Sequence, residues 1–484
     1  MATVQSVPPG PAARAGGPGP LDRGAHQEPA GAAGRLQAAF AAGTTRPLAW
    51  RRGQLRAMVD MLTERQSELL EALSADLGKP ALEGWLTDVA QVVNEVRHIL
   101  DHLEGWAAPQ KVKIPAQLRP GRAQVVKEPL GAALVIAPWN YPVQLLLLPM
   151  AFAIAAGNAV CGKPSELTPH TSAALARWSS LYLDRQAVTV IEGDAAVARD
   201  LLTQRWDHIF YTGNGRIGRV VMEAAARHLT PVTLELGGKS PAVVDRTANI
   251  EVAARRIAWG KFLNAGQTCV APDYVLVDRA VEAALLDALV ESIEHFYGPR
   301  PESSPDFGRI VSDRHVERLE GLLASLETSR VVTGGHVVAE SRYVAPTVLT
   351  GTTWDEPVMA EEIFGPILPV IAVDGMDEAV AQINRGDKPL AIYVFSEDAG
   401  AQRAVTEGTS SGGVCVNATL LHLAVSDLPF GGVGPSGMGS YHGKWGFDTF
   451  SHHKAVLTRP TRFDPPLTYP PYGRVKSWLL RRAF

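Results

Sequence analysis

Residues 132–163, with the sequence AALVIAPWNYPVQLLLLPMAFAIAAGNAVCGK, determine the fold class of this 484-residue chain. Prolines and asparagines interrupt the apolar run, and in a lipid bilayer they would break a helix and leave polar groups unsatisfied. We therefore do not expect a membrane span. We expect a strand at Ala132–Ala137, a buried helix at Pro142–Ala156 and a second strand at Ala159–Lys163. A strand, a helix and a strand in succession predict a parallel sheet covered on both faces.

The same alternation extends along most of the chain. Helical periodicity begins near residue 35, with helices expected at 47–76 and 82–103. The sequence predicts an α/β protein with a first domain formed by residues 35–109 and 128–232 and a second formed by residues 233–416. Two segments, 110–127 with a polar β-ribbon pattern and 417–457 with many loop residues, are expected to form a small β element. Further strands are expected at 188–192, 208–212, 241–244, 274–277, 330–332, 343–349, 367–373 and 391–395.

The two ends of the chain differ from this core. Residues 1–34 are mostly Pro, Gly and Ala with hardly a large apolar side chain, which predicts a disordered tail. Residues 458–484 form a C-terminal tail whose last part, from Arg474 to Phe484, mixes basic residues with Trp478 and two leucines. The tail could contact a membrane surface or a partner, although it is short for either function. It carries no lipidation signal.

The composition excludes several classes of function. A net charge of −4 gives no electrostatic basis for binding nucleic acid, and 46% apolar residues are typical of a globular protein. Three cysteines, Cys161, Cys269 and Cys415, cannot form a disulfide framework and lack zinc-type spacing. His452 and His453 have no Cys, Asp or Glu cluster beside them, so we expect no metal site. Free thiols and no secretion signal favour the cytoplasm.

A glycine-rich turn follows one of the predicted strands. Residues 211–218, YTGNGRIG, contain a G-x-G-x-x-G motif that opens a helix. Glycines allow the backbone to approach a phosphate, and the helix N-terminus offers free N–H groups. This context favours a Rossmann-like dinucleotide site over a simple tight turn. The Rossmann pattern would assign Glu235 to a ribose, but a carboxyl group among leucines is better suited to accept a proton.

Three side chains have the chemistry of acyl transfer. Cys269 follows a predicted helix at Ile250–Phe262 and a flexible Ala-Gly pair, so its thiol can be reached by a substrate. Glu235 lies at the end of a β-rich run and before two glycines, where desolvation would raise its pKa. Asn140 lies between a buried strand and a buried helix, where its amide could stabilise an oxyanion. Each alone could equally be a structural residue.

Two loop motifs offer groups for a nucleotide. Lys163-Pro-Ser-Glu166 follows a predicted strand, at the end of a sheet where open α/β folds bind ligands. Glu361-Glu-Ile-Phe-Gly-Pro366 places a carboxylate beside an aromatic ring that could flank a flat ring of a ligand. Solvated loop charges remain the alternative for both.

Taken together, these motifs resemble the aldehyde dehydrogenase superfamily over residues 35–457. The form PWNYP around Asn140, the segment Phe262–Cys269 followed by APDY, and the ending FDTFSHHK at 447–454 resemble class 3. The resemblance implies a Rossmann-like NAD(P)-binding domain, with 233–416 as the catalytic domain. The segments 110–127 and 417–457 would bridge the subunits of a homodimer. Gly215 departs from the family, whose members usually carry a larger residue there.

The resemblance also implies the role of each residue. Cys269 would be the nucleophile, Asn140 and the Cys269 backbone N–H the oxyanion hole, and Glu235 the general base. The expected activity is NAD- or NADP-dependent oxidation of medium- or long-chain aliphatic or aromatic aldehydes. The residues implied to bind the cofactor are Trp139, Lys163, Ser165, Glu166, Gly213, Gly218, Glu362 and Phe364.

Other activities stay possible on this fold. A CoA-acylating or semialdehyde-specific dehydrogenase would share the nucleophile, although a CoA-dependent enzyme would not need a base at Glu235. A thiol hydrolase would need a histidine beside Cys269, which no motif supplies. A non-catalytic binding protein would not need nucleophile, base and oxyanion donor together.

Overall fold

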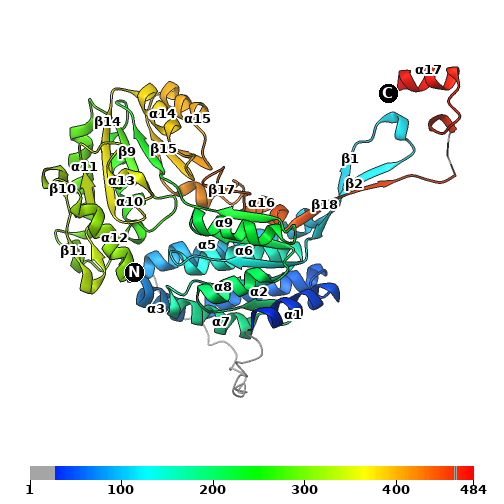
Figure 1. Cartoon of the computed structure of the whole chain (residues 1–484), viewed down its shortest axis with the longest axis horizontal. Helices are drawn as coiled ribbons and strands as arrows, with labels where there is room; N and C mark the ends of the chain where they lie inside the picture. The colour runs from blue at the N-terminus through cyan, green and yellow to red at the C-terminus, as the bar shows by residue number, and fades with distance from the viewer. Residues whose placement is uncertain (1–27, 463, 465, 484) are drawn as a thin grey trace, which may run out of the picture.

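The computed structural model describes residues 28–462, 464 and 466–483, which form two α/β halves and a projecting arm (Figure 1). The first half contains a six-stranded sheet of order β17-β7-β6-β3-β4-β5, parallel except for β17. This is the α/β fold that the sequence predicts. The strands of this sheet are β3 (Ala132–Ile136), β4 (Ala159–Lys163), β5 (Val188–Val190), β6 (His208–Thr212), β7 (Val232–Glu235) and β17 (Gly437–Met438).

The βαβ unit predicted from residues 132–163 is present. Helix α6 (Pro142–Ala156) joins β3 to β4, begins with a proline and stops at Gly157, whose φ of 96° is left-handed. Nearly every side chain of α6 is buried because the sheet and other helices surround it. Alternate residues of β3 face opposite cores: Ala133 and Val135 join the larger core, and Ala132 and Leu134 the smaller one.

Helices cover both faces of this sheet. Side chains of α2, α5, α6 and α7 pack in the larger core, and those of α1, α8 and α9 in the smaller one. The helices of the first half are α1 (Pro29–Ala41), α2 (Leu48–Glu64), α3 (Gln66–Leu77), α4 (Ala81–Gly84), α5 (Gln91–Ala107), α7 (Pro169–Tyr182), α8 (Ala195–Thr203), α9 (Gly215–Ala226) and α16 (Gly443–Thr449).

The N-terminal boundary differs from the prediction. Most of the expected disordered tail, residues 1–27, lies outside the described residues, but its last part is helical because α1 begins at Pro29. The prediction was wrong there because small alanines, which give no hydrophobic signal, pack closely: Ala32 and Ala33 are buried in the smaller core.

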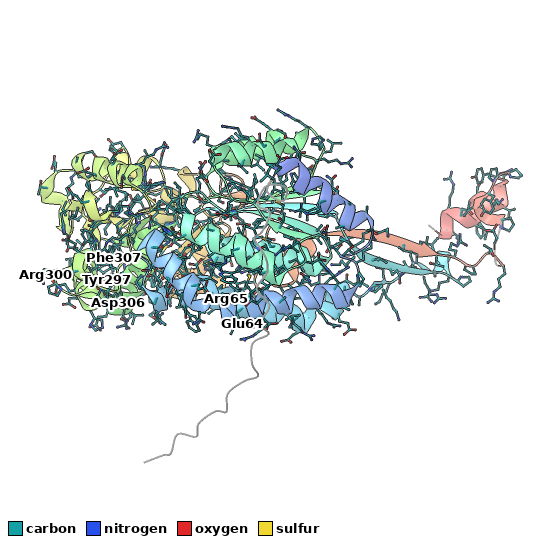
Figure 2. All side chains as sticks on the ribbon, turned by 90° about the horizontal axis from the view of Figure 1, so that it is seen from below. Glu64, Arg65, Tyr297, Arg300, Asp306 and Phe307 are labelled. Atoms are coloured by element: carbon teal, nitrogen blue, oxygen red, sulfur yellow. The ribbon has the colours of Figure 1, made fainter. Side chains whose placement is uncertain are left out.

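The two long helices predicted next are interrupted. Expected helix 47–76 divides into α2 and α3 at Arg65, which lies beside Glu64 in Figure 2 and leaves the helical conformation with φ −105° and ψ 14°. Expected helix 82–103 begins with α4 and continues through one π-helical segment, η1 (Trp85–Ala90), before α5. A π-helical turn inside a helix is frequent at functional sites.

The second half contains a seven-stranded sheet of order β10-β13-β14-β9-β8-β15-β16, in which only β10 is antiparallel. The predicted strand 343–349 is two short strands, because Tyr343–Val344 pairs with β11 in a separate two-stranded sheet and only Thr347–Leu349 joins the seven-stranded sheet. The strands are β8 (Pro241–Val244), β9 (Tyr274–Asp278), β10 (Val331–Thr333), β11 (Val337–Val338), β12 (Tyr343–Val344), β13 (Thr347–Leu349), β14 (Ile367–Val373), β15 (Ala391–Phe395) and β16 (Gly413–Val416). The helices are α10 (Ile250–Phe262), α11 (Glu282–Tyr297), α12 (Asp313–Ala324), α13 (Pro357–Ala360), α14 (Met376–Arg385) and α15 (Ala399–Gly408).

The boundary between the halves lies later than predicted. Strand β7 pairs with β6, so residues 233–235, expected in the second domain, complete the first sheet. Strand β17, from the loop-rich segment after residue 416, closes the outer edge of β7. The chain therefore returns to the first half near its end.

The arm contains the first of the two predicted β segments but only the end of the second, because β17 and α16 of the segment 417–457 pack with the first half. Strands β1 (Gln110–Val112), β2 (Arg122–Pro129) and β18 (Ser451–Thr458) pair antiparallel and project away from the body, with α17 (Arg474–Ala483) at the far end (Figures 1 and 2). Most residues of β18 are exposed. None of the helices that the structure describes is both long and apolar enough to cross a membrane.

Candidate active site

The predicted catalytic residues lie where the two sheets meet end to end. Asn140 follows the carboxyl end of β3, and Glu235 is the last residue of β7, so the first sheet presents both at its carboxyl edge. Cys269 precedes β9 and Glu362 precedes β14, so the second sheet presents both at its amino edge. The fold thus brings together residues that are far apart in the sequence.

The loop that carries Cys269 has an unusual backbone. Asn264 and Ala265, in η3 (Leu263–Gly266), both have a left-handed φ of 52°. A side chain on Gly266 would place its Cβ 2.3 Å from the carbonyl oxygen of Gly365, so only glycine fits. Residues held in such sparsely populated conformations cluster at active sites.

The Gln267 side chain holds this loop in place. Its amide nitrogen donates to the carbonyl oxygens of Asn264 and Arg309, each at 2.9 Å, and its oxygen accepts from Val311 N–H at 2.9 Å. Because Gln267 is fully buried, these bonds are protected from water. Cys269, two residues later, remains partly exposed.

Asn140 is fixed beside the same loop. Its side-chain nitrogen donates to the Gln267 carbonyl oxygen at 3.0 Å, and the residue is only 2% exposed. An amide NH₂ has two hydrogens, so this bond leaves one to donate elsewhere. The neighbouring Tyr141 hydroxyl lies 2.5 Å from the Thr268 hydroxyl, directly before Cys269. The predicted oxyanion donor and nucleophile are therefore joined through adjacent residues.

Glu235 is a buried carboxyl group without a hydrogen-bond partner in the described part of the protein. It is 3% exposed, and neither of its carboxyl oxygens is bonded. Burial raises its pKa well above the ordinary value. An unpaired buried carboxyl group is a place where water can bind. The environment of Glu235 is thus the apolar one predicted from its sequence.

The Cys269 thiol responds to the two acidic groups. Burial raises its pKa to about 12, and the charges of Glu362 and Glu235 contribute in that order. An electrostatic effect of this kind requires that the three groups lie near one another. Burial and the two nearby acidic groups therefore favour the protonated thiol over the thiolate.

The predicted adenosine-binding residues lie at the end of β4. Lys163 is buried, and its ammonium group lies 3.6 Å from a carboxylate oxygen of Glu166 and 2.7 Å from the Pro164 carbonyl oxygen. The Ser165 hydroxyl accepts from Leu167 N–H at 3.2 Å. The Glu166 side chain is 46% exposed, so both a donor and an acceptor are available for ribose hydroxyl groups.

The glycine-rich turn has two distinct parts. Asn214 caps α9 by accepting from Ile217 N–H at 3.0 Å, and the earlier N–H groups of the helix stay available for a phosphate. A Cβ on Gly213 would lie 2.2 Å from the Tyr211 hydroxyl. A Cβ on Gly218 would lie 3.0 Å from the Leu236 side chain, so Gly218 packs the helix against the sheet. The turn is therefore suited to bind a dinucleotide. Gly218 would contribute indirectly, by allowing α9 to pack closely against the sheet.

Glu362, Phe364 and Trp139 form the opposite side of the site. The Phe364 and Trp139 rings meet edge to face with centroids 5.3 Å apart. Phe364 has a left-handed φ of 47°. Burial raises the pKa of Glu362 to about 8, with Asp273 adding to the effect. These groups offer an aromatic surface and an acceptor, which suits a nicotinamide nucleoside.

Lys239 and Asp273 complete the site and were missed by the sequence analysis. Lys239 contacts Asp273 at 2.5 Å and donates to the carbonyl oxygens of Val358 at 3.1 Å and Glu361 at 2.9 Å. Asp273 also accepts from Ile363 N–H at 3.0 Å. The pair holds the segment that carries Glu362. Lys239 directly follows two glycines, which is a signal in the sequence. Its partner Asp273 is distant in the sequence, so the pair itself could not be predicted.

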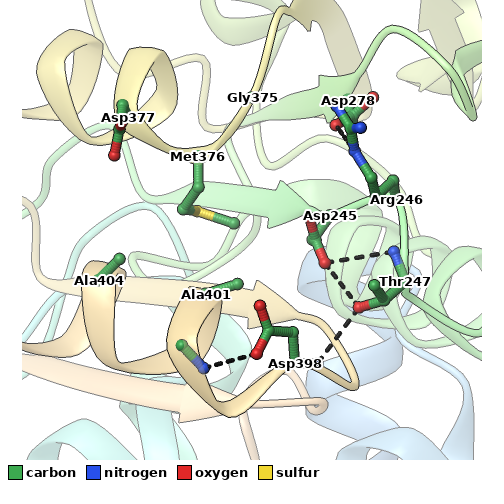
Figure 3. Close-up of a pocket in the computed structure, with 11 residues that line it drawn as sticks. Asp245, Arg246, Thr247, Asp278, Gly375, Met376, Asp377, Asp398, Ala401 and Ala404 are labelled. Atoms are coloured by element: carbon green, nitrogen blue, oxygen red, sulfur yellow. Dashed lines mark hydrogen bonds and ion pairs between the residues drawn. The ribbon is translucent and has the colours of Figure 1, made fainter.

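A hollow elsewhere in the second half is not part of this site. It has a volume of about 430 Å³ and lies at the carboxyl edge of the second sheet, opposite the edge that carries Cys269 (Figure 3). Three of the four acidic groups that line it are bonded to protein atoms: Asp278 to Arg246, Asp245 to Thr247, and Asp398 to Gly400 N–H at the start of α15. No group of three or more metal-ligating side chains occurs among the described residues.

Comparison with known proteins decides the family. The model of the aldehyde dehydrogenase family matches residues 23–456. The chain belongs to the aldehyde dehydrogenase family. It is 45% identical over 447 residues to mouse "Aldehyde dehydrogenase family 3 member A2", covering 92% of each chain. It is 46% identical to the dog "Aldehyde dehydrogenase, dimeric NADP-preferring", covering 90% of this chain and 96% of the dog protein.

A solved structure supports the same assignment. "Substrate bound state of Staphylococcus Aureus AldH" superposes with a TM-score of 0.91 at 43% identity, covering 93% of this chain and 98% of that chain. This aldehyde dehydrogenase is therefore a class 3 enzyme that oxidises aldehydes with NAD or NADP. The fold, the family and the activity predicted from the sequence are confirmed, and the CoA-acylating and non-catalytic alternatives are not favoured.

Proposed function

We propose that Cys269, Asn140 and Glu235 carry out the oxidation through a covalent thioester. The observation that carries this proposal is the arrangement of the site: the Asn140 side chain bonds to the loop of Cys269, and Glu235 lies at the same edge of the first sheet with both carboxyl oxygens unbonded. The Cys269 sulfur adds to the aldehyde carbon, and the carbonyl oxygen gains negative charge. The Asn140 amide and the Cys269 backbone N–H donate to that oxygen.

Glu235 acts in the second half of the reaction. Its carboxylate takes a proton from water, and the resulting hydroxide attacks the thioester carbon. The C–S bond breaks, the leaving Cys269 thiolate takes up the proton held by Glu235, and the carboxylic acid is released. A buried carboxylate with a raised pKa is a stronger base than an exposed one. Its two unbonded oxygens are suited to hold the water.

The cofactor is held by groups on both sides of the site. Lys163, Ser165 and Glu166 would bind the adenosine ribose, and the start of α9 with Gly213 would bind the phosphates. Glu362 would bind the second ribose, with Phe364 and Trp139 beside the flat ring. NAD or NADP, when bound, would supply the hydride acceptor, so that the adduct on Cys269 loses the hydrogen of the aldehyde carbon as hydride and becomes the thioester. The exposed Glu166 carboxylate favours a free ribose hydroxyl over a 2′-phosphate.

The family, the arm and the cysteines support proposals for the substrate, the assembly and the compartment. Membership of class 3 supports medium- or long-chain aliphatic or aromatic aldehydes as the substrates. The arm of β1, β2 and β18 suits a homodimer, because the exposed edge of β18 can pair with a second copy. The three cysteines of the protein are free, which supports a location in the reducing cytoplasm. Light scattering should give the mass of a dimer; a monomer would contradict this assembly.

A substitution of the nucleophile tests the catalytic assignment. The Cys269→Ser variant should lose formation of reduced cofactor from any aldehyde in a panel assayed with NAD and with NADP. A matched control is Cys415→Ser, which removes another thiol and should leave turnover unchanged. Substantial turnover by the Cys269→Ser variant would refute the assignment.

A further inference from the structure

A buried ion pair lies behind the oxyanion donor. The Lys79 ammonium group is 2.8 Å from Asp88, and both side chains are 0% exposed. Lys79 follows Gly78, which ends α3 with a left-handed φ of 58°, and Asp88 lies in the π-helical segment η1. Charged side chains are almost never fully buried unless they are paired. The pair is therefore closed off from solvent.

The pair forms hydrogen bonds with the backbone at Asn140 and at the start of the helix that follows it. The Lys79 ammonium group donates to the Asn140 carbonyl oxygen at 3.1 Å and lies 4.2 Å from the centre of the Tyr141 ring. The other Asp88 oxygen accepts from the N–H groups of Val143 at 3.1 Å and Gln144 at 3.3 Å. These are first-turn groups of α6, whose own cap residue supplies no side-chain bond.

The same segment also contacts the loop of the nucleophile. The Asn140 carbonyl oxygen accepts a second bond from the Asn264 side chain at 2.8 Å. The Asn264 N–H donates to Glu83, which lies between Lys79 and Asp88 in the sequence, at 3.0 Å. The Tyr141 hydroxyl bonds to Thr268. One short stretch of the first half thus holds the donor and, through it, the loop of Cys269.

We infer that Lys79 and Asp88 are a positioning pair for the oxyanion site. Replacing both members of a buried ion pair by uncharged residues is often neutral or stabilising, so stability alone does not require the charges. The geometry gives them another use: two donors converge on the Asn140 carbonyl oxygen, and Asp88 fixes the start of the helix that follows. The inference rests on the proposed role of Asn140.

The double variant Lys79→Met/Asp88→Asn tests it. This variant approximately keeps the side-chain sizes and removes both charges of the Lys79–Asp88 pair together. We expect a melting temperature near that of the wild type, and a rate of the first turnover about 10- to 100-fold lower, because a displaced oxyanion donor costs up to that much. The KM for the cofactor should not change, since the pair contacts none of the cofactor residues.

Three companion variants make the result decisive. Asp88→Glu keeps the charge and both acceptors, and should recover most of the rate. The control Arg52→Met/Glu104→Gln removes a solvent-exposed ion pair at 3.0 Å between α2 and α5, and should leave the rate unchanged. If the double variant does not fold, Tyr141→Phe deletes only the hydroxyl group, and it should also slow the first turnover.

The outcomes separate this inference from the proposed function. A wild-type first-turnover rate in the folded double variant, or in Tyr141→Phe where the double variant does not fold, would overturn the positioning pair. If Asn140→Ala also kept the wild-type rate, the oxyanion role of Asn140 itself would fall. A slow double variant with an unchanged cofactor KM, and recovery by Asp88→Glu, would establish the pair. If the first-turnover rate fell equally in Asp88→Glu and in the double variant, the pair would have only a structural role, and the inference would be overturned.

Discussion

The raised pKa of the Cys269 thiol gives a measurable prediction for the free enzyme. At pH 8, a thiol with a pKa of about 12 is ionised to about one part in 10⁴, whereas one with the ordinary value of 9.0 is ionised to about one part in ten. Because alkylation requires the thiolate, Cys269 should react with iodoacetamide about 1,000-fold more slowly than an ordinary thiol. Its rate should rise about tenfold per pH unit up to pH 10.

The assay follows the Cys269 peptide by mass spectrometry without cofactor, with Cys269→Ser as the blank. Glu362 is the larger of the two electrostatic contributors and ionises at about pH 8, so its charge is present at pH 9. The Glu362→Gln variant should therefore react faster than the wild type at pH 9, and Glu235→Gln should change the rate less. A plateau of the alkylation rate below pH 9 in the free enzyme would refute this electrostatic account.

Three more predictions concern neighbouring groups. The Glu235→Gln variant should give a burst of reduced cofactor and then turnover about 100-fold or more below wild type; an unchanged steady-state rate would remove Glu235 from the mechanism. Lys239→Met should raise the cofactor KM about tenfold, a loss of about 1.4 kcal/mol, because the Glu362 segment loses its anchor; an equal KM would contradict this. The raised pKa of Glu83, about 7 through burial, means that the folded state binds the extra proton, so stability falls between about pH 4.5 and 7. Glu83→Gln should therefore gain melting temperature relative to wild type from pH 5 to pH 8, and a constant difference would argue against the burial effect.

Much of the fold could be predicted because its local signals agree with one another. The strand and helix bounds at 142–156, 159–163, 208–212, 241–244 and 250–262 match the structure, since hydrophobic runs, prolines and glycines mark the same ends. The disordered tail was extended too far, because small alanines give no hydrophobic signal. The domain boundary was placed before Thr233, because nothing local shows that β7 pairs with β6.

The sequence could predict which chemical groups the site contains, but not how the fold arranges them. The environment of Glu235 follows from its leucine neighbours, and the thiol of Cys269 from its loop. The Lys239–Asp273 pair joins residues 34 apart in the sequence, and no local pattern connects them. Lys79 and Asp88 are only nine residues apart, but their contact with Asn140 exists only after a distant segment has folded against them. The rule that ligands lie at carboxyl edges holds for the first sheet. The second sheet offers its amino edge instead, which no strand pattern reveals.

Strand β17 has a consequence for the order of events during synthesis. It covers the outer edge of the strand that ends with Glu235, yet it is made about two hundred residues later, at Gly437 and Met438. A ribosome-bound chain that has finished both sheets except for this strand still exposes the backbone beside its base. Catalytic activity should thus appear only after β17 has been synthesised. Chains released before that point should be inactive, with the outer edge of β7 unpaired.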